Sequence, residues 1–169
     1  MALVATTVLE GSIQEILEEI HDTALTETKL TPRSVESLRA VALAGDLVIL
    51  KSDTHLVGWG IREELRPELK EVGLMFIKPA FRSAASFILL ARELANVPDS
   101  LILATYDAAL IRQAVIEFGF REASLLQVII TSRGRFVTKR LNRSSRTAVA
   151  QHTKMGKPLF AIREGETGD

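Results

Sequence analysis

Two hydrophobic periods follow each other along the chain, and each change of period predicts an element boundary. Apolar residues recur every three or four positions, the spacing of a helix with one buried face, from Ile13 to Ala24, Pro32 to Gly45, Arg82 to Asn96 and Asp107 to Gly119. Short β-rich runs between these segments predict strands. The runs are Leu3–Leu9, Leu47–Lys51, Leu56–Ile61, Glu71–Ile77, Leu101–Tyr106, Leu125–Thr131, Phe136–Leu141 and a short final one within Lys157–Ile162.

Residues with special backbone chemistry mark the ends of these helices. Ser12 and Glu15 have the spacing of a capping box at the start of the first helix. Pro32 suits the first position of the second helix, where its missing N–H costs nothing. Asp107 predicts an N-cap and Gly119 a left-handed C-terminal end for the fourth helix.

Turn-forming and polar segments separate the strands. We expect Ser52–His55 to turn between two strands, with His55 as an ordinary turn residue, and Arg62–Lys70 to be a polar interval before the third strand of an antiparallel meander. Arg133–Arg135 would form the tip of a last hairpin that joins Leu125–Thr131 to Phe136–Leu141.

The resulting order, β-α-α-β-β-β-α-β-α-β-β, predicts an α/β fold in which a mixed sheet carries helices on both faces. We expect one domain over residues 1–141 and a basic C-terminal extension over residues 142–169 that includes the short final strand.

Charge is balanced in sum and separated in position. The 169 residues carry 21 Lys and Arg and 21 Asp and Glu. Glu10–Glu36 is mostly acidic, whereas Arg133–Arg163 is basic and contains no acid. The basic segment has three interpretations: nucleic-acid binding, attraction of an acidic substrate or of phosphates, and pairing with the acidic helix within the chain or in a homodimer. We favour pairing, since few aromatic residues accompany the bases for stacking on nucleic acid.

Composition excludes several kinds of chemistry. The chain has no cysteine, which rules out a thiolate nucleophile, an iron–sulfur cluster and a Cys-ligated zinc site. Its three histidines lie far apart, so we expect no metal site. No run approaches the roughly 18 apolar residues of a membrane span, and the start lacks the basic flank of a signal peptide. We therefore expect a cytoplasmic protein without membrane contact.

Three stretches in the order strand, loop and helix carry a resemblance to a known family. Glu71–Pro79 is similar to a strand that often starts with Glu and ends in a hydrophobic-x-Pro sequence, Arg82–Phe87 lies at the place of a glycine-rich loop, and Asp107–Phe120 looks like a helix that ends in Gly-Phe. Together they resemble the GNAT superfamily of acyl-CoA-dependent N-acetyltransferases, over about Leu3–Leu141. The resemblance implies a mixed, mostly antiparallel central sheet flanked by helices on both faces.

The resemblance also implies acetyl-CoA or another acyl-CoA as co-substrate, with no metal. Backbone N–H groups at the start of a helix would hold its pyrophosphate. Ala85 and Phe87 stand where the family has glycines, and Ser83 and Ser86 would add hydroxyl donors. The implied cofactor-binding residues are Phe76, Ile77, Arg82, Ser83, Ala84, Ala85, Ser86, Phe87 and Asp107.

Two residues are candidates for catalysis by this resemblance. Glu71 corresponds to a general base that accepts the proton of the attacking amine; alternatively, it is a surface charge paired with Lys70 or another base. Val115 stands where many members carry a general-acid tyrosine. Tyr106, the only tyrosine, would substitute as acid or donor, or would only pack at a strand end.

Trp59 lies between Gly58 and Gly60 on a predicted strand. It would line an acceptor pocket, with the glycines leaving room for a ligand, or would simply be a large core side chain. The leading hypothesis is direct acyl transfer to a small-molecule or protein amine. The alternative is a catalytically degenerate module of the same fold that senses a ligand or binds a protein, since it lacks both glycines and the tyrosine.

Overall fold

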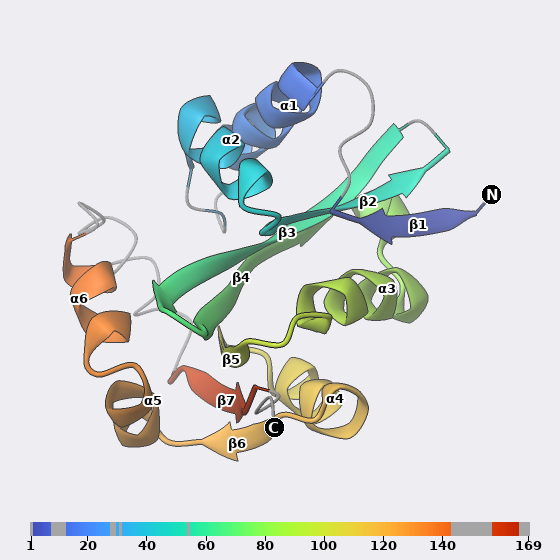
Figure 1. Cartoon of the computed structure of the whole chain (residues 1–169). Helices are drawn as coiled ribbons and strands as arrows, with labels where there is room; N and C mark the ends of the chain where they lie inside the picture. Colours follow the sequence, from blue (N-terminus) through green and yellow to red (C-terminus); the bar gives the residue numbers. More distant parts are fainter. Residues whose placement is uncertain are drawn as a thin grey trace. The chain divides into compact units, whose positions relative to one another are not determined.

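The computed structural model describes residues 2–7, 13–27, 30, 32–53, 55–142 and 157–165. The predicted capping box begins at Ser12, outside the described residues, as does most of the basic segment that follows residue 142. Figure 1 shows the course of the chain. The elements are β1 (Leu3–Thr6), α1 (Ile13–Thr26), α2 (Val35–Leu43), β2 (Leu47–Ser52), β3 (His55–Arg66), β4 (Leu69–Ile77), η1 (Pro79–Phe81), α3 (Ala84–Ala95), β5 (Ser100–Thr105), α4 (Ala108–Phe118), β6 (Arg121–Ala123), α5 (Leu125–Thr131), α6 (Arg135–Asn142) and β7 (Leu159–Arg163).

The strands form a mixed sheet in the hydrogen-bonded order β1-β2-β3-β4-β5-β7-β6. β4 and β5 pair in parallel, Leu69–Val72 against Ser100–Leu103. The pairs β1–β2, β2–β3, β5–β7 and β6–β7 are antiparallel. The predicted α/β class with a mixed, mostly antiparallel sheet is therefore confirmed.

The chain divides into two compact units, and two strands contribute to both. The first unit comprises Met1–Glu63 and Gly73–Asn96, and the second comprises Glu64–Val72 and Val97–Asp169.

In the first unit, α1 and α2 lie on one face of β2 and β3, and α3 lies on the other face (Figure 1). Side chains alternate between the two faces because successive strand residues point in opposite directions. Leu47 and Ile49 of β2, with Trp59 and Ile61 of β3, pack under α1 and α2. On the α3 side, Gly60 leaves space for Leu94.

The second helix begins later than its proline suggested. Pro32 precedes α2, which starts at Val35 and is capped by Ser34, whose side-chain oxygen accepts from the Ser37 N–H at 3.2 Å. This hydroxyl satisfies an amide that would otherwise be unpaired, which Pro32 cannot do. Gly45, with φ of 72°, follows the helix end as predicted.

The prediction that Arg62–Lys70 is a polar interval between strands is wrong. β3 continues to Arg66, and β4 starts at Leu69 after a tight turn in which Glu68 has φ of 62°. Charged residues can lie in strands here because they are paired: Arg62 with Asp46, and Glu63 with Arg33.

In the second unit, α4 lies against β5, β6 and β7. Asp107 caps it, accepting from the Ala109 N–H at 2.8 Å, and Gly119 ends it with φ of 69°, so both predicted helix ends are confirmed. A core on the strands includes Leu69, Ile102 and Phe160.

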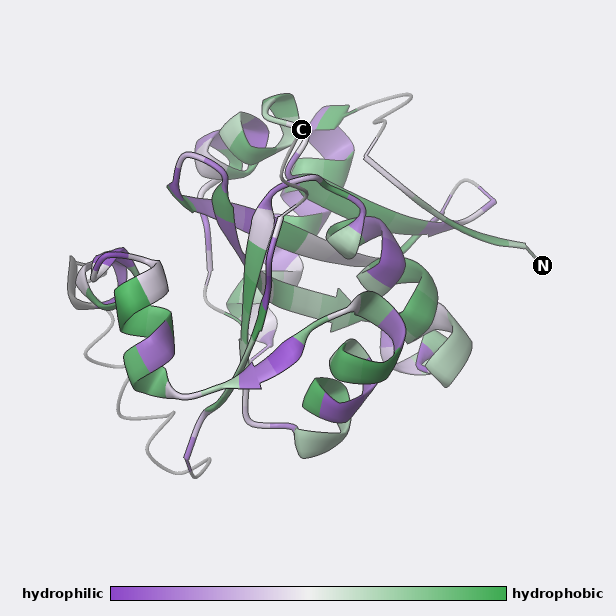
Figure 2. Cartoon of the chain, turned by 60° about the horizontal axis from the view of Figure 1, so that its bottom comes forward, coloured by the Kyte–Doolittle hydropathy of each residue, from purple (hydrophilic) through white to green (hydrophobic). Residues whose placement is uncertain are grey.

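The predicted last hairpin is wrong. Leu125–Thr131 and the segment from Arg135 form helices α5 and α6, and the strands that pair are β6 and β7. Ser124 and Gln127 form a complete capping box that starts α5, which local β propensity did not indicate. In Figure 2 the purple, hydrophilic strand β6 leads into α5, whose residues are mostly green.

Candidate active site

A short turn prepares the start of α3 in the first unit. After the 3₁₀ turn Pro79–Phe81, Arg82 and Ser83 are extended, with ψ of 110° and 162°, and the helix begins at Ala84. The Ser83 hydroxyl oxygen accepts from the Ser86 N–H at 3.1 Å and caps the helix. The N-terminus of α3 is thus fixed by its own first turn.

Both serine hydroxyl hydrogens of this turn are used inside it. The buried Ser86 hydroxyl donates to the Phe81 carbonyl oxygen at 2.7 Å. Ser83 Oγ lies 2.8 Å from Ser86 Oγ, so Ser83 must be the donor of that bond. In this conformation neither serine offers its hydroxyl hydrogen to a phosphate, contrary to the expectation from the sequence.

The backbone of the same turn is open. Ala84 and Ala85 are exposed, and as the first two residues of the helix they have no intrahelical acceptor for their N–H groups. Such groups, together with the helix dipole, favour an anion. No residue from Pro79 to the half-buried Phe87 has positive φ, so this turn needs no glycine, and Ala85 carries none of the strain that a lost glycine would cause.

Phe76 and Ile77, the β4 residues nearest to this turn in sequence, could bind a co-substrate mainly through their backbone groups. The Phe76 ring is buried and contacts Trp59, with ring centroids 4.6 Å apart. Arg82 Nε donates to the Ile77 carbonyl oxygen at 2.8 Å, and its guanidinium lies 5.8 Å from the Phe76 ring centroid. Arg82 is exposed and precedes the first two residues of α3 by only one residue, Ser83.

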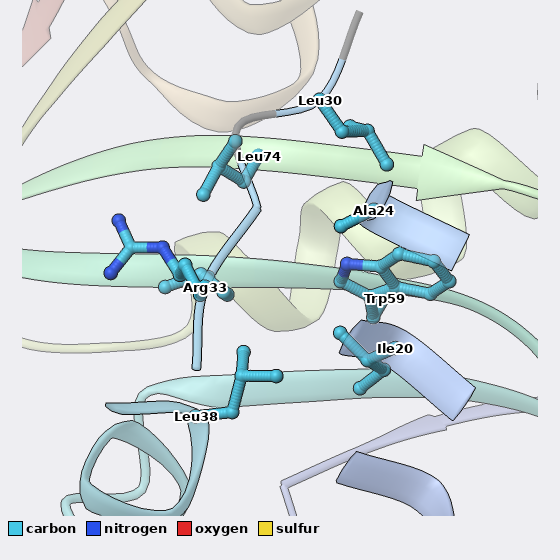
Figure 3. A pocket seen from close by; sticks show the side chains of 8 residues that line it. Ile20, Ala24, Leu30, Arg33, Leu38, Trp59 and Leu74 are labelled. Atoms are coloured by element: carbon cyan, nitrogen blue, oxygen red, sulfur yellow. The ribbon is translucent and has the colours of Figure 1, made fainter. Parts of the chain in front are cut away.

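A small pocket lies on the α1 and α2 side of the first unit (Figure 3). Its volume of about 10 Å³ holds roughly one water molecule. The Trp59 indole forms one wall, and the Arg33 guanidinium extends along another side, away from the indole. The lining residues are Ile20, Ala24, Leu30, Arg33, Leu38, Trp59, Ile61 and Leu74.

Trp59 is a core side chain, 2% exposed, and it also lines this small pocket. The flanking glycines have a packing explanation. A Cβ on Gly58 would lie 2.6 Å from the Phe76 carbonyl oxygen, and one on Gly60 would lie 2.4 Å from Leu94 Cδ1. The glycines make room for β4 and α3, not for a ligand.

Leu74, which also lines this pocket, has an unusual backbone conformation. Its φ is 49°, in the left-handed region that leucine rarely adopts, within strand β4. Strain of this kind persists only where the surrounding packing fixes it, and it is frequent at functional sites. The Leu74 side chain packs against the buried cluster that contains Trp59 and Phe76.

In the second unit, Glu71 of β4 is buried and ion-paired with Arg140 of α6. Glu71 is 9% exposed and lies opposite Ile102 of β5. Its Oε1 accepts from Arg140 NH2 at 2.5 Å, and its Oε2 from NH1 at 3.4 Å. Lys70, the alternative partner, pairs with Asp99 at 3.5 Å.

Tyr106 and Asp107 follow the end of β5. Tyr106 is 36% exposed, and Asp107 uses its carboxylate to cap α4. Asp107 therefore has a structural role independent of any ligand.

Sequence reasoning missed Arg140 and Leu74. Arg140 lies far from Glu71 in sequence, on a segment predicted as a strand, so no local signal indicates the pair. Gly73, directly before Leu74, was the one signal of a distorted strand.

Within the described ranges, no three His, Asp or Glu side chains gather where a metal ion could bind. No helix in those ranges combines the length and apolar character that crossing a membrane requires.

Comparison with known proteins gives structural matches alone. No family model matches the sequence, and the search of curated proteins gives no match. Among solved structures, a GNAT-family acetyltransferase from Bacillus cereus is 15% identical, with 99% of this chain and 100% of that chain covered and a TM-score of 0.56. The ribosomal-protein-S18-alanine N-acetyltransferase from Escherichia coli is 13% identical, with 99% and 97% covered and a TM-score of 0.59.

A third similar structure is the N-acetylglutamate synthase from Neisseria gonorrhoeae, complexed with coenzyme A and N-acetyl-glutamate. It is 13% identical with a TM-score of 0.57; the match covers 99% of this chain but spans only 36% of the length of that protein. The chain thus has the fold of the GNAT acetyltransferases, the family that its sequence resembles.

Proposed function

We propose that the protein is an acyl-CoA-dependent N-acyltransferase that moves an acetyl or other acyl group directly to a primary amine of a small molecule or a protein. The observation that carries this proposal is the start of α3, where the exposed residues Ala84 and Ala85, whose N–H groups have no intrahelical acceptor, follow Arg82 in a GNAT fold. Similar structures hold coenzyme A or acetyl-CoA, as in the Neisseria enzyme and in yncA from Salmonella typhimurium.

The residues of the first unit fit a pyrophosphate. The N–H groups of Ala84 and Ala85 would donate to its oxygens, and Arg82 would add a positive charge. The backbone of Phe76 and Ile77 would bind the adjoining part of the co-substrate. When bound, an acyl-CoA supplies a thioester carbonyl that an amine can attack.

Two residues of the second unit would act as general base and general acid. Glu71 would accept the proton of the attacking amine, directly or through a water molecule, at Oε2, the oxygen that Arg140 holds less closely. Tyr106, partly exposed at the end of β5, would donate a hydrogen bond or a proton to the leaving thiolate. No covalent enzyme intermediate is required.

The experiment is a thermal-shift titration with acetyl-CoA and longer acyl-CoAs, followed by a CoA-release assay over a panel of amines. The protein has no cysteine, so a thiol reagent detects released CoA without a background from the enzyme. We expect a rise in Tm and amine-dependent release. No shift at millimolar acyl-CoA would reject the proposal.

The second candidate is a non-catalytic GNAT-like module that senses a ligand or binds a protein. The observation that favours it is that the Glu71 carboxylate is already held by Arg140, while Val115 occupies the position of the usual tyrosine. Such a module would give a Tm shift with acyl-CoA but no CoA release with any amine.

We further propose that the protein forms a homodimer through opposite charges. The exposed face of α1 carries Glu15, Glu18 and Asp22, whereas Arg133 and Arg135 are exposed at α6. Next to these bases, α5 exposes apolar side chains that would become buried in a dimer. This α5 face consists of Leu125, Leu126 and Ile130.

A further inference from the structure

An unusually long connection joins β6 to β7. These strands pair as antiparallel neighbours, Arg121–Ala123 against Phe160–Ile162, and a hairpin turn of about 2–5 residues could join such a pair. Residues 124–158 lie between them instead and include α5 and α6. We call this segment the β6–β7 insertion.

A side chain from the described part of the insertion contacts the candidate base. Arg140 of α6 contacts Glu71 of β4, and its guanidinium lies 3.5 Å from the centroid of the Phe136 ring. Arg140 NH1 also donates to the Phe136 carbonyl oxygen at 3.3 Å. Phe136 is 3% exposed and belongs to the core of the second unit, so the guanidinium rests on a fixed support.

The two carboxylate oxygens of Glu71 are held unequally. Oε1 lies 2.5 Å from Arg140 NH2, whereas Oε2 lies 3.4 Å from NH1, near the limit of a hydrogen bond. A carboxylate offers about four acceptor positions, and the guanidinium uses two of them. Arg140 therefore fixes the orientation of the carboxylate and leaves Oε2 the more available oxygen.

We propose that Arg140 of the β6–β7 insertion is a positioning residue for Glu71: it orients the carboxylate so that Oε2 accepts the proton of the acceptor amine. The proposal rests on the proposed acyl transfer and extends it, because it makes proton transfer depend on helix α6, which lies outside the sheet. Arg140 itself contacts neither co-substrate nor amine in this scheme.

The test compares Arg140→Ala with Arg112→Ala, a control at an exposed arginine of α4 in the same unit, in the CoA-release assay. Arg140→Ala should lower kcat about 10- to 100-fold, the range expected when a general base is misplaced. The KM for acyl-CoA should change by less than about twofold, since ground-state binding is not affected. Arg112→Ala should keep the kcat of the parent protein.

Chemical rescue separates positioning from a purely structural role. Methylguanidinium should restore part of the kcat of Arg140→Ala in a saturable manner, because it is planar and can donate two parallel N–H groups. Methylammonium, a point charge, should not. Rescue by neither compound, or a kcat of Arg140→Ala within twofold of the parent value, would overturn the proposal.

Measurements of Tm test the contact between Arg140 and Glu71 independently of enzyme activity. Arg140→Ala should lower Tm by about 2–6 °C in the parent protein, and by clearly less when Glu71→Gln is already present. Equal losses in both backgrounds show that Arg140 does not hold Glu71, which refutes the proposal. If the parent protein releases no CoA, the proposed function fails, and this comparison alone decides whether the pair exists.

Discussion

Arg62 on β3 donates its Nε hydrogen to Asp46 Oδ1 at 3.0 Å, and the two residues are only 3% and 7% exposed. The same guanidinium donates to the carbonyl oxygens of Glu93 and Leu94 at 3.0 and 3.4 Å, near the end of α3. One buried cation therefore ties the start of β2 and the end of α3 to β3.

Replacing Arg62 with an uncharged residue should destabilise the protein. We expect Arg62→Met to lower the free energy of unfolding by about 3–5 kcal/mol, because the buried Asp46 carboxylate then loses the charge of the Arg62 guanidinium. Adding Asp46→Asn to Arg62→Met should recover part of that loss. Urea unfolding measures both values, and a loss under about 1 kcal/mol for Arg62→Met would show that the pair is not a major source of stability.

The contact of Gly60 with Leu94 gives a second prediction. Gly60→Ala should destabilise the protein by about 1–3 kcal/mol, since the new methyl group would lie 2.4 Å from Leu94 Cδ1. Leu94→Ala removes that atom. The double variant should therefore lose less stability than the sum of the two single losses. Additive losses would instead mean that Gly60 is required for another reason.

A proline tests the open amides of α3. Ala84→Pro removes one N–H at the first helical position, where proline is tolerated, and the extended Ser83 before it has ψ of 162°, which suits a following proline. We expect Tm of the free protein to change little and acyl-CoA affinity to fall about 10- to 150-fold, the loss of one hydrogen bond to a charged group.

Ala84→Ser is the control for that variant because it keeps the N–H group. Isothermal titration with acetyl-CoA measures all three proteins. Unchanged affinity of Ala84→Pro would mean that the first amide of α3 does not hold the pyrophosphate.

The α5 face gives a prediction about self-association. Leu126 and Ile130 are 65% and 66% exposed, and Leu126→Glu with Ile130→Glu would place charges in the proposed dimer interface. Light scattering should show a concentration-dependent dimer for the parent protein and a monomer for this variant. Ile116→Glu on α4, where Ile116 is 72% exposed, should leave the dimer intact; equal effects of both changes would exclude the α5 face.

Local chemistry was enough to predict part of the fold. Asp107 and Gly119 end α4 as their backbone preferences require, and the short final strand is β7. The segment after Ser124 was misread because Val128, Ile129 and Ile130 have strand propensity, whereas its capping box and tertiary packing favour a helix. Propensity is a weak guide where packing can override it.

The candidate site was less accessible to sequence reasoning. The predicted Glu71 has a specific partner, but Arg140 is distant in sequence, and such pairing depends on the completed fold. Ala85 and Phe87 stand where the family has glycines, yet the turn before α3 has no position that demands positive φ. A motif describes residue types, whereas the requirement for glycine is set by backbone angles.

The position of β7 also constrains the order in which the second unit can form during synthesis. β7 lies between β5 and β6, yet its last residue, Arg163, is made after both of them and after the whole β6–β7 insertion. Until it leaves the ribosome, β5 and β6 each lack a hydrogen-bonded neighbour on that side. A nascent chain that stalls before residue 159 therefore exposes two unpaired strand edges, the sites at which incomplete sheets associate wrongly.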